Sequence, residues 1–309
     1  MMRWRASAVG GFLCAITAVE AHAHGVVGER AFIEPFITED VNPKNEFVIA
    51  RPEWDHSRDG SALSVGFGLE KKISDRFSLT LDSSWNEISP EPSSEPHESG
   101  FNNLGITGKY AFFINPAHEA IASIALEASA PTGSQNVGAE KDWAFKPFLL
   151  YGKGLGDLPS AVKYLRPLAL QGDAGFEVST DHDRTTTFAH NVAVEYSVPY
   201  LQSFVRDLGL RWPLSNLIAD TEFNFEHGVN GADHGHTKAF ATPGVVYMDR
   251  YVELGVAGRF PLNDRAHQEL DWGIIWIVDL FIDDILPWTR WQLIGGMQPP
   301  SGLPGGSAP

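Results

Sequence analysis

The stretch FNNLGITGKYAFF, residues 101–113, alternates between two kinds of side chain. One parity carries Leu104, Ile106, Gly108, Tyr110 and Phe112, and the other carries Asn103, Gly105, Thr107, Lys109 and Ala111. Because neighbouring residues of an extended strand point to opposite faces, a period of two predicts a strand with one apolar and one polar face. We therefore expect a fold built from two-faced strands.

The same alternation recurs along the chain. It is clear in residues 61–70, 76–84, 190–198 and 251–260, and weaker around 46–54, 119–130, 143–154, 166–178, 217–227, 238–248 and 269–282. The segments number about twelve, and each has about ten residues, the length that a tilted strand needs to cross a bilayer. Their connections alternate between shorter and longer ones, as in exported barrels, except that residues 199–215 are long where a short turn is expected. The sequence predicts an all-β fold, a single transmembrane antiparallel β-barrel over residues 45–294.

A secreted β-sandwich would also contain alternating strands. A sandwich buries its apolar face, and its loops need not alternate in length. Here aromatic residues stand at strand ends on the apolar parity, as in the interfacial girdles of membrane barrels. They are Trp143, Phe145, Tyr151, Trp272 and Trp276, with Trp288 and Trp291 beyond. This distribution favours the barrel.

Residues 1–23 have the features of a cleaved secretory signal peptide, namely Arg3 and Arg5, a short apolar run, and the small residues of Ala21-His22-Ala23. Cleavage near Ala23 would remove the single cysteine, Cys14. We expect residues 24–44 to form an N-terminal periplasmic segment and the Gly/Pro-rich residues 295–309 to be a disordered tail. Residues 199–215 are expected to contain a short amphipathic helix beside the barrel.

The composition excludes several classes of function. The 309 residues include 39 acidic and 23 basic ones, giving a formal charge of -16, which argues against binding to nucleic acid. One cysteine cannot form a disulfide framework or a cysteine zinc site. No dinucleotide or phosphate-binding glycine loop occurs, because Gly66, Gly68, Gly152 and Gly154 lie within predicted strands. We expect no cofactor.

The polar parity of the strands is expected to line the lumen. Its charged members are Glu70, Arg76, Asp82, Lys109, Glu127, Lys146, Asp173, Glu177, Glu195, Glu222, Glu226, Glu253 and Arg259. Buried charges are costly unless they are paired or hydrated, and here acids outnumber bases. The surplus indicates either a wet pore that favours cations or a polar plug of paired groups.

Two other sets of residues offer alternative functions. His227, Asp233, His234 and His236 place imidazoles and a carboxylate close together in an outer loop, a composition that could capture a divalent metal in a binding or sensing barrel. His190 stands on an apolar parity with Thr186 and Ser197 nearby in sequence, which raises a second alternative, an outer-membrane lipid hydrolase.

The run from Gly100 to Tyr110, followed by a strand that closes in Ala130-Pro131-Thr132-Gly133-Ser134, resembles barrels of the MetA-pathway-of-phenol-degradation, or putative transporter, family. The resemblance covers residues 60–155. It departs from the family pattern at Asn103, where an Asp is frequent, and in the absence of a terminal aromatic residue. The resemblance implies an outer-membrane channel or transporter-like barrel. Only the resemblance implies that its solutes are small hydrophobic or aromatic compounds.

The sequence thus predicts a porin-like, non-enzymatic pore in a bacterial outer membrane, through which small solutes pass passively. The lumen is expected to favour cations or small neutral compounds. The expected partners are membrane lipid and small-molecule solutes, without nucleic acid and without a required oligomer.

Overall fold

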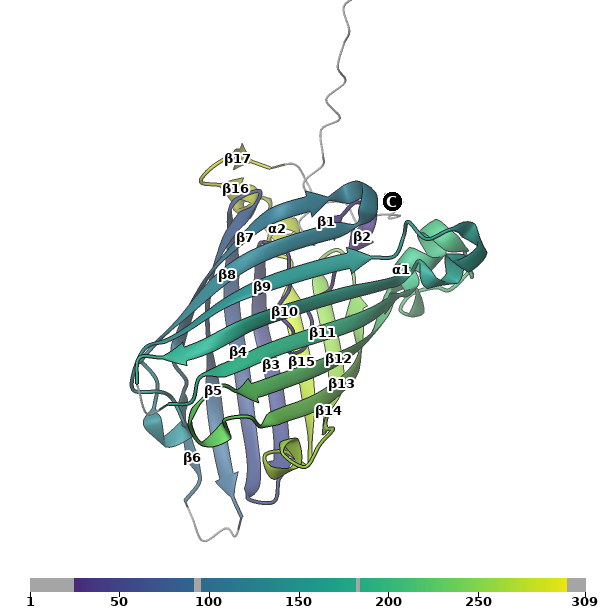
Figure 1. The fold of residues 1–309 in the computed structure, drawn as a ribbon. Helices are drawn as coiled ribbons and strands as arrows, with labels where there is room; N and C mark the ends of the chain where they lie inside the picture. The colour runs from purple at the N-terminus through teal and green to yellow at the C-terminus, as the bar shows by residue number, and fades with distance from the viewer. Residues whose placement is uncertain (1–24, 92–95, 182–183, 299–309) are drawn as a thin grey trace, which may run out of the picture.

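The structure is a computed structural model that describes residues 25–91, 96–181 and 184–298, and it forms a closed β-barrel (Figure 1). Its wall consists of β3 (Glu46–Ser57), β4 (Gly60–Ser74), β5 (Phe77–Pro90), β7 (Leu104–Asn115), β8 (Ala120–Ala130), β9 (Ala144–Gly154), β10 (Leu168–Ser179), β11 (Thr187–Ser197), β12 (Leu217–Gly228), β13 (Thr237–Met248), β14 (Val252–Pro261) and β15 (Trp272–Leu280). Every wall strand is antiparallel to its neighbours, and β15 pairs with β3 to close the ring, with Ile274 opposite Trp54. The predicted barrel is confirmed, and the sandwich is excluded.

Shorter elements of the described chain are not among the twelve strands of the wall. They are β1 (Val26–Val27), β2 (Arg30–Ala31), β6 (Glu98–Phe101), β16 (Trp291–Gln292), β17 (Gly296–Met297), α1 (Val198–Tyr200), α2 (Ile282–Ile285), and the single turns η1 (Pro116–His118), η2 (Gln135–Val137), η3 (Ser160–Leu165), η4 (Leu201–Val205), η5 (Leu214–Asn216), η6 (Gly231–Asp233), η7 (Ala266–Gln268) and η8 (Pro287–Arg290). Among the described residues, no helix is both long and apolar enough to cross a membrane.

The two faces of the wall differ as the alternation predicts. Apolar side chains on the outside stay exposed, with Leu79 at 43%, Leu81 at 51% and Leu126 at 51%. Polar side chains on the inside are buried, including Lys109 at 1% and Glu195 at 0%. Closure pairs both edges of every wall strand, so the wall leaves no long free edge. This arrangement is the reverse of a water-soluble core.

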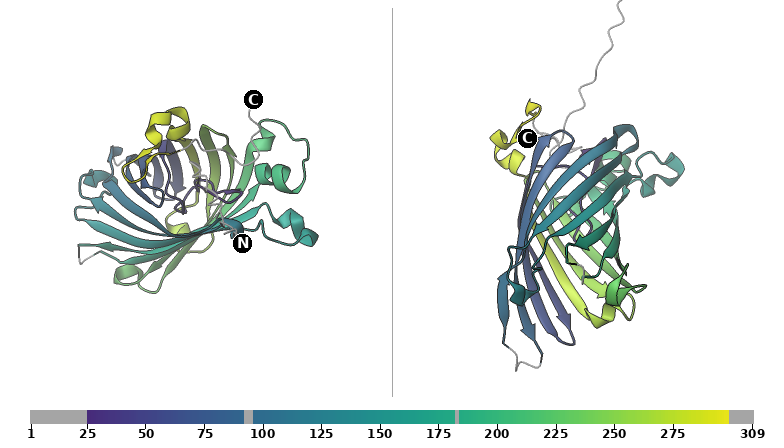
Figure 2. Two further views of the ribbon diagram at one scale, coloured as in Figure 1. Left: turned by 90° about the horizontal axis from the view of Figure 1, so that it is seen from above. Right: turned by 60° about the vertical axis from the view of Figure 1, so that its left-hand side comes forward.

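The connections differ in detail from the expected ones. The predicted strand at residues 76–84 is longer in the structure, because β5 runs on to Pro90 and β6 pairs with it, with Ile88 opposite Glu98. The helical parts of residues 199–215 are short: α1, η4 and the start of η5, and α1 and η4 lie beside one end of the barrel (Figures 1 and 2).

The predicted signal peptide and residues 299–309 of the predicted tail lie outside the described residues. The start of that tail is regular, because β16 and β17 form a small hairpin with Trp291 opposite Met297. Gly295 and Gly296 supply the positive φ angles, 122° and 73°, that this tight turn requires. The expectation of disorder from Gly295 onward therefore does not hold for residues 295–298.

The largest departure concerns residues 25–45, here called the lumen segment. They were expected to form a segment outside the barrel, but they run inside it, enclosed by the wall strands (Figure 2). The physical reason is their content of apolar and charged side chains that the inner wall complements, as described below.

Candidate functional site

The lumen segment enters the barrel because its large apolar side chains find apolar patches on the inner wall. Val27, Phe32 and Val41 pack in one cluster, and Ile33 and Phe36 pack in another. The wall contributes Ala111, Ile121, Ala125, Phe148, Leu150 and Ala169 to the first cluster and Ile218, Val246, Met248, Ala257, Ile275, Ile277 and Phe281 to the second. Phe32 and Phe36 are only 2% and 1% exposed, so burial of apolar area favours docking.

Glycines of the wall make room for these side chains. A Cβ atom on Gly255 would lie 2.8 Å from Cε1 of Phe36, and one on Gly152 would lie 2.9 Å from Cγ1 of Val41. Both distances are shorter than ordinary carbon contacts. The absence of side chains at these positions therefore shapes the wall to the segment.

Glu222 on β12 holds the tip of the lumen segment. Its carboxylate accepts hydrogen bonds from the backbone N–H groups of Phe36, Ile37 and Thr38, and Thr38 Oγ1 also donates to it at 2.6 Å. Glu222 is fully buried. One carboxylate thus satisfies several backbone donors that would otherwise be buried without partners.

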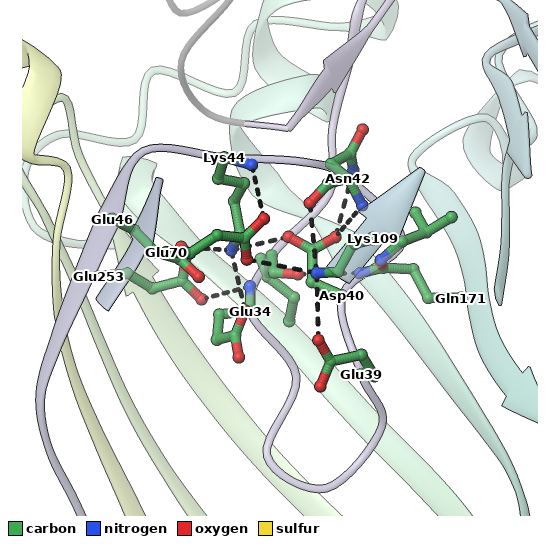
Figure 3. A network of polar contacts seen from close by, with 12 residues as sticks. Glu34, Glu39, Asp40, Asn42, Lys44, Glu46, Glu70, Lys109, Gln171 and Glu253 are labelled. Atoms are coloured by element: carbon green, nitrogen blue, oxygen red, sulfur yellow. Dashed lines mark hydrogen bonds and ion pairs between the residues drawn. The ribbon is translucent and has the colours of Figure 1, made fainter. Parts of the chain in front are cut away.

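Lys44 is the centre of a charged cluster at the other end of the segment (Figure 3). Its Nζ lies 2.8 Å from Glu34, 2.7 Å from Asp40 and 2.6 Å from Glu46. Burial alone would lower the pKa of Lys44, but these carboxylates hold it well above its usual value. Burial would likewise raise the pKa of Glu34, but the cations of Lys44 and Arg51 lower it to about 2.

Wall side chains also contact the segment backbone. Glu253 Oε1 accepts from the N–H of Glu34 at 3.0 Å, and Glu70 Oε1 accepts from the N–H of Lys44 at 2.9 Å. Lys109 Nζ lies 3.3 Å from Glu70 and 3.1 Å from Glu39 of the segment. These contacts replace the water that a polar lumen would otherwise contain.

Arg30 fixes the segment where it enters. Its guanidinium donates to the backbone oxygens of Arg166 and Pro167, at 2.5 and 2.9 Å, and lies 3.4 Å from Glu119. The same group lies 3.9 Å from the centre of the Tyr200 ring, a cation–π arrangement. The connections before β10 and after β11 are therefore both tied to the lumen segment.

The interior still has a surplus of acids. Asp220 and Asp279 each lie beside another carboxyl group, that of Glu222 and that of Glu46. Both side chains are almost fully buried, at 1% and 0% exposed. Asp220 stands directly opposite Glu195 on the neighbouring strand, so two carboxyl groups face each other.

The structure places most of the predicted lumen residues on the inner wall. Those buried there are Glu70, Lys109, Asp173, Glu195, Glu222 and Glu253. Half-buried ones are Asp82, Glu127, Lys146, Glu226 and Arg259, while Glu177 is exposed near the loop end of β10. The expectation for Arg76 is wrong, because this residue lies in the turn between β4 and β5, exposed, and donates to the carbonyl of Phe112 at 3.4 Å.

Beside the segment a cavity of about 330 Å³ remains. Its lining includes the acids Glu34, Glu39, Glu46, Glu70, Asp82 and Glu127, together with Arg51. A cation entering this cavity would meet more carboxylates than bases.

The four predicted metal residues do not form one ligand set. His227 Nδ1 contacts Thr237 Oγ1 at 2.7 Å, His234 Nδ1 contacts the carbonyl of Val229 at 2.6 Å, and Asp233 lies 3.7 Å from Arg265. Asp233 and His236 line one small pocket, which His227 and His234 do not line. Among the described residues, no three His, Cys, Asp or Glu side chains are arranged to hold a metal ion.

His190 faces outward, as its parity predicts, but not toward the expected hydroxyls. Its ring stacks on Phe225, and its Nδ1 lies 3.2 Å from Nε2 of His227. Thr186 bonds to Asn230, and Ser197 accepts from the N–H of Tyr200. The three residues proposed for a hydrolase are therefore not assembled.

The sequence reasoning missed the charged residues of the lumen segment, Arg30, Glu34, Asp40 and Lys44. A signal was present, because residues 32–37 read FIEPFI, which is too apolar for an exposed tail. No alternation or helical spacing marks this stretch, so its position depends on the barrel around it.

Comparisons with known proteins bear on the fold. No family model and no curated protein matches the chain. The COG4313 outer membrane channel from Pseudomonas putida F1 superposes with a TM-score of 0.57 at 11% identity, covering 81% of this chain and 99% of that one. The NanC porin gives 0.47 at 8% identity, covering 77% and 98%, and the outer membrane phospholipase of Salmonella typhi gives 0.41 at 7%, covering 83% and 98%. The likeness is one of fold. The likeness to the first of these structures shows the closed barrel fold alone, and the resemblance to the phenol-degradation family stays a prediction.

Proposed function

We propose that the chain is a passive channel for small solutes in a bacterial outer membrane, and that the lumen segment sets how far it is open. The observation that carries this proposal is an acidic lumen filled by a segment that only non-covalent contacts hold. An apolar outer wall and a sealed polar interior support the membrane location.

The contents of the lumen favour two classes of solute. The carboxylates around the remaining cavity favour small cations. Withdrawal of the lumen segment would also bare wall residues such as Phe148, Leu150 and Ile218, which suit small hydrophobic compounds. The second class agrees with the family resemblance of residues 60–155.

Conductance in planar bilayers tests the proposal. Under a salt gradient we expect a zero-current potential of the sign of cation selectivity, which Asp82→Asn and Glu127→Asn should both reduce because they remove charge from the cavity. Asp157→Asn is the matched control, since Asp157 lies outside the wall strands, pairs with His118 and Lys153, and does not line the cavity. Absence of conductance in every variant, or selectivity for anions, would contradict the proposal.

A further inference from the structure

An apolar groove of about 480 Å³ lies between the outer wall and the C-terminal residues 281–298. It is lined by Phe47, Leu69, Ile282, Leu286, Trp288 and Trp291, with Lys71 and Thr289 as its polar members. We call it the outer groove.

The wall of the outer groove belongs to the outside of the barrel. Phe47 and Leu69 are 39% and 44% exposed, whereas their neighbours Glu46 and Glu70 point inward and are buried. The groove is thus continuous with the apolar outer face of β3 and β4 rather than with the lumen.

The opposite side of the groove is held in place. Lys71 Nζ donates to the carbonyl of Thr289 at 2.6 Å and to Asn45 Oδ1 at 2.7 Å. Farther along, the N–H of Ile294 donates to the carbonyl of Ile73 at 2.9 Å. Residues 281–298 are therefore fixed to the end of β4. These contacts also fix the shape of the groove between residues 281–298 and the outer wall.

These C-terminal residues expose large apolar side chains. Trp288 is 69% exposed, Leu293 68%, Ile294 67% and Met297 62%. Several exposed large apolar side chains on one short segment favour contact with another apolar phase, and tryptophan is enriched where a membrane meets water.

We infer that the outer groove binds an acyl chain of an anionic phospholipid, with the lipid phosphate beside Lys71. Three observations favour this occupant: continuity with the apolar outer face, a lining with almost no polar atoms to hold water, and a cation at the edge of the groove. The inference rests on the membrane location in the proposed function, but not on conduction.

Native mass spectrometry of the detergent-solubilised barrel, exchanged into phosphatidylglycerol or phosphatidylcholine, tests the inference. Leu69→Trp should fill the groove and reduce retained phosphatidylglycerol at least tenfold. Leu79→Trp is the matched control, because Leu79 is 43% exposed on the outer face of β5 and does not line the groove. Lys71→Gln should abolish the preference for phosphatidylglycerol over phosphatidylcholine, and this ratio is unaffected by a general loosening of the groove.

Equal retention in Leu69→Trp and Leu79→Trp would overturn the inference. So would a full-length chain that retains no lipid while a chain ending at Gln298 does, because residues 299–309 would then be the occupant. Bilayer conductance of the same samples separates the two claims. A silent barrel with groove-bound lipid refutes only the channel, and a conducting barrel without it refutes only the lipid site.

Discussion

The contact between Glu222 and the lumen segment makes the sharpest prediction. Glu222→Ala removes the acceptor for the N–H groups of Phe36, Ile37 and Thr38 and for the Thr38 hydroxyl. A hydrogen bond to a charged group contributes about 1.5–3 kcal/mol, and a buried donor without a partner costs about 1–3 kcal/mol. These bonds share one carboxylate and are not additive, so we expect docking of the segment to weaken by about 3–6 kcal/mol in total.

Since about 1.4 kcal/mol corresponds to a factor of ten, the ratio of docked to undocked segment should fall by roughly 10²–10⁴. Single-channel recording should then show larger or more frequent open levels. Limited trypsin digestion should also cut after Arg30 and Lys44, which are buried in the docked segment.

Glu226→Ala is the matched control. Glu226 lies on the same strand and face but contacts Lys238, at 3.7 Å, and not the segment. Identical conductance and protease resistance in Glu222→Ala and Glu226→Ala would refute the idea that the segment is held through Glu222 and limits the opening.

Three further predictions concern the interior. Gly255→Leu should displace Phe36, whose ring lies 2.8 Å from the new Cβ position, and raise conductance as Glu222→Ala does; unchanged current would show that the wall adapts. Asp220→Asn should stabilise the barrel by about 1–3 kcal/mol at pH 8, because a buried carboxyl group beside Glu195 and Glu222 costs more to ionise than a neutral amide costs to bury; a lower unfolding temperature would reveal a cation that pairs with Asp220. The pKa of Glu34 falls from 4.5 to about 2, so its contribution of about 3 kcal/mol is present above pH 4.5 and is lost as the pH falls toward 2. Glu34→Gln should therefore lower the unfolding temperature equally between pH 5 and 7, and a difference that grows on acidification would contradict this assignment.

Much of the wall could be predicted from the sequence, because alternation reports directly on which side chains face lipid and which face inward. The stretch 101–113 gave such a pattern, and β7 spans Leu104–Asn115 with Lys109 inside. The alternation predicts the facing of residues next to turns less well. Arg76 shares the parity of Ser78, but the strand begins only at Phe77, so Arg76 lies in the turn.

The wall residues of the candidate site could be predicted in the same way. Glu222, Glu253 and Lys109 follow from the strand pattern, but their partners in residues 25–45 do not. The N–H of Phe36 meets a carboxylate 186 positions away, and no local spacing encodes such a contact. The sequence pattern predicted the inward acids of the wall, but it did not predict the lumen segment whose backbone and side chains contact them.

The seam between β3 and β15 has a consequence for biogenesis. Trp54 meets Ile274 only when nearly the whole chain has been threaded into place, so this pairing has a high loop-closure cost and is expected to form late. Residues 25–45 precede the first wall strand, and they must either be enclosed as the cylinder wraps around them or enter afterwards through an open mouth. If the sheet wraps around residues 25–45, these residues serve as a template on which the wall strands assemble. A chain without them would have to assemble around a hollow centre.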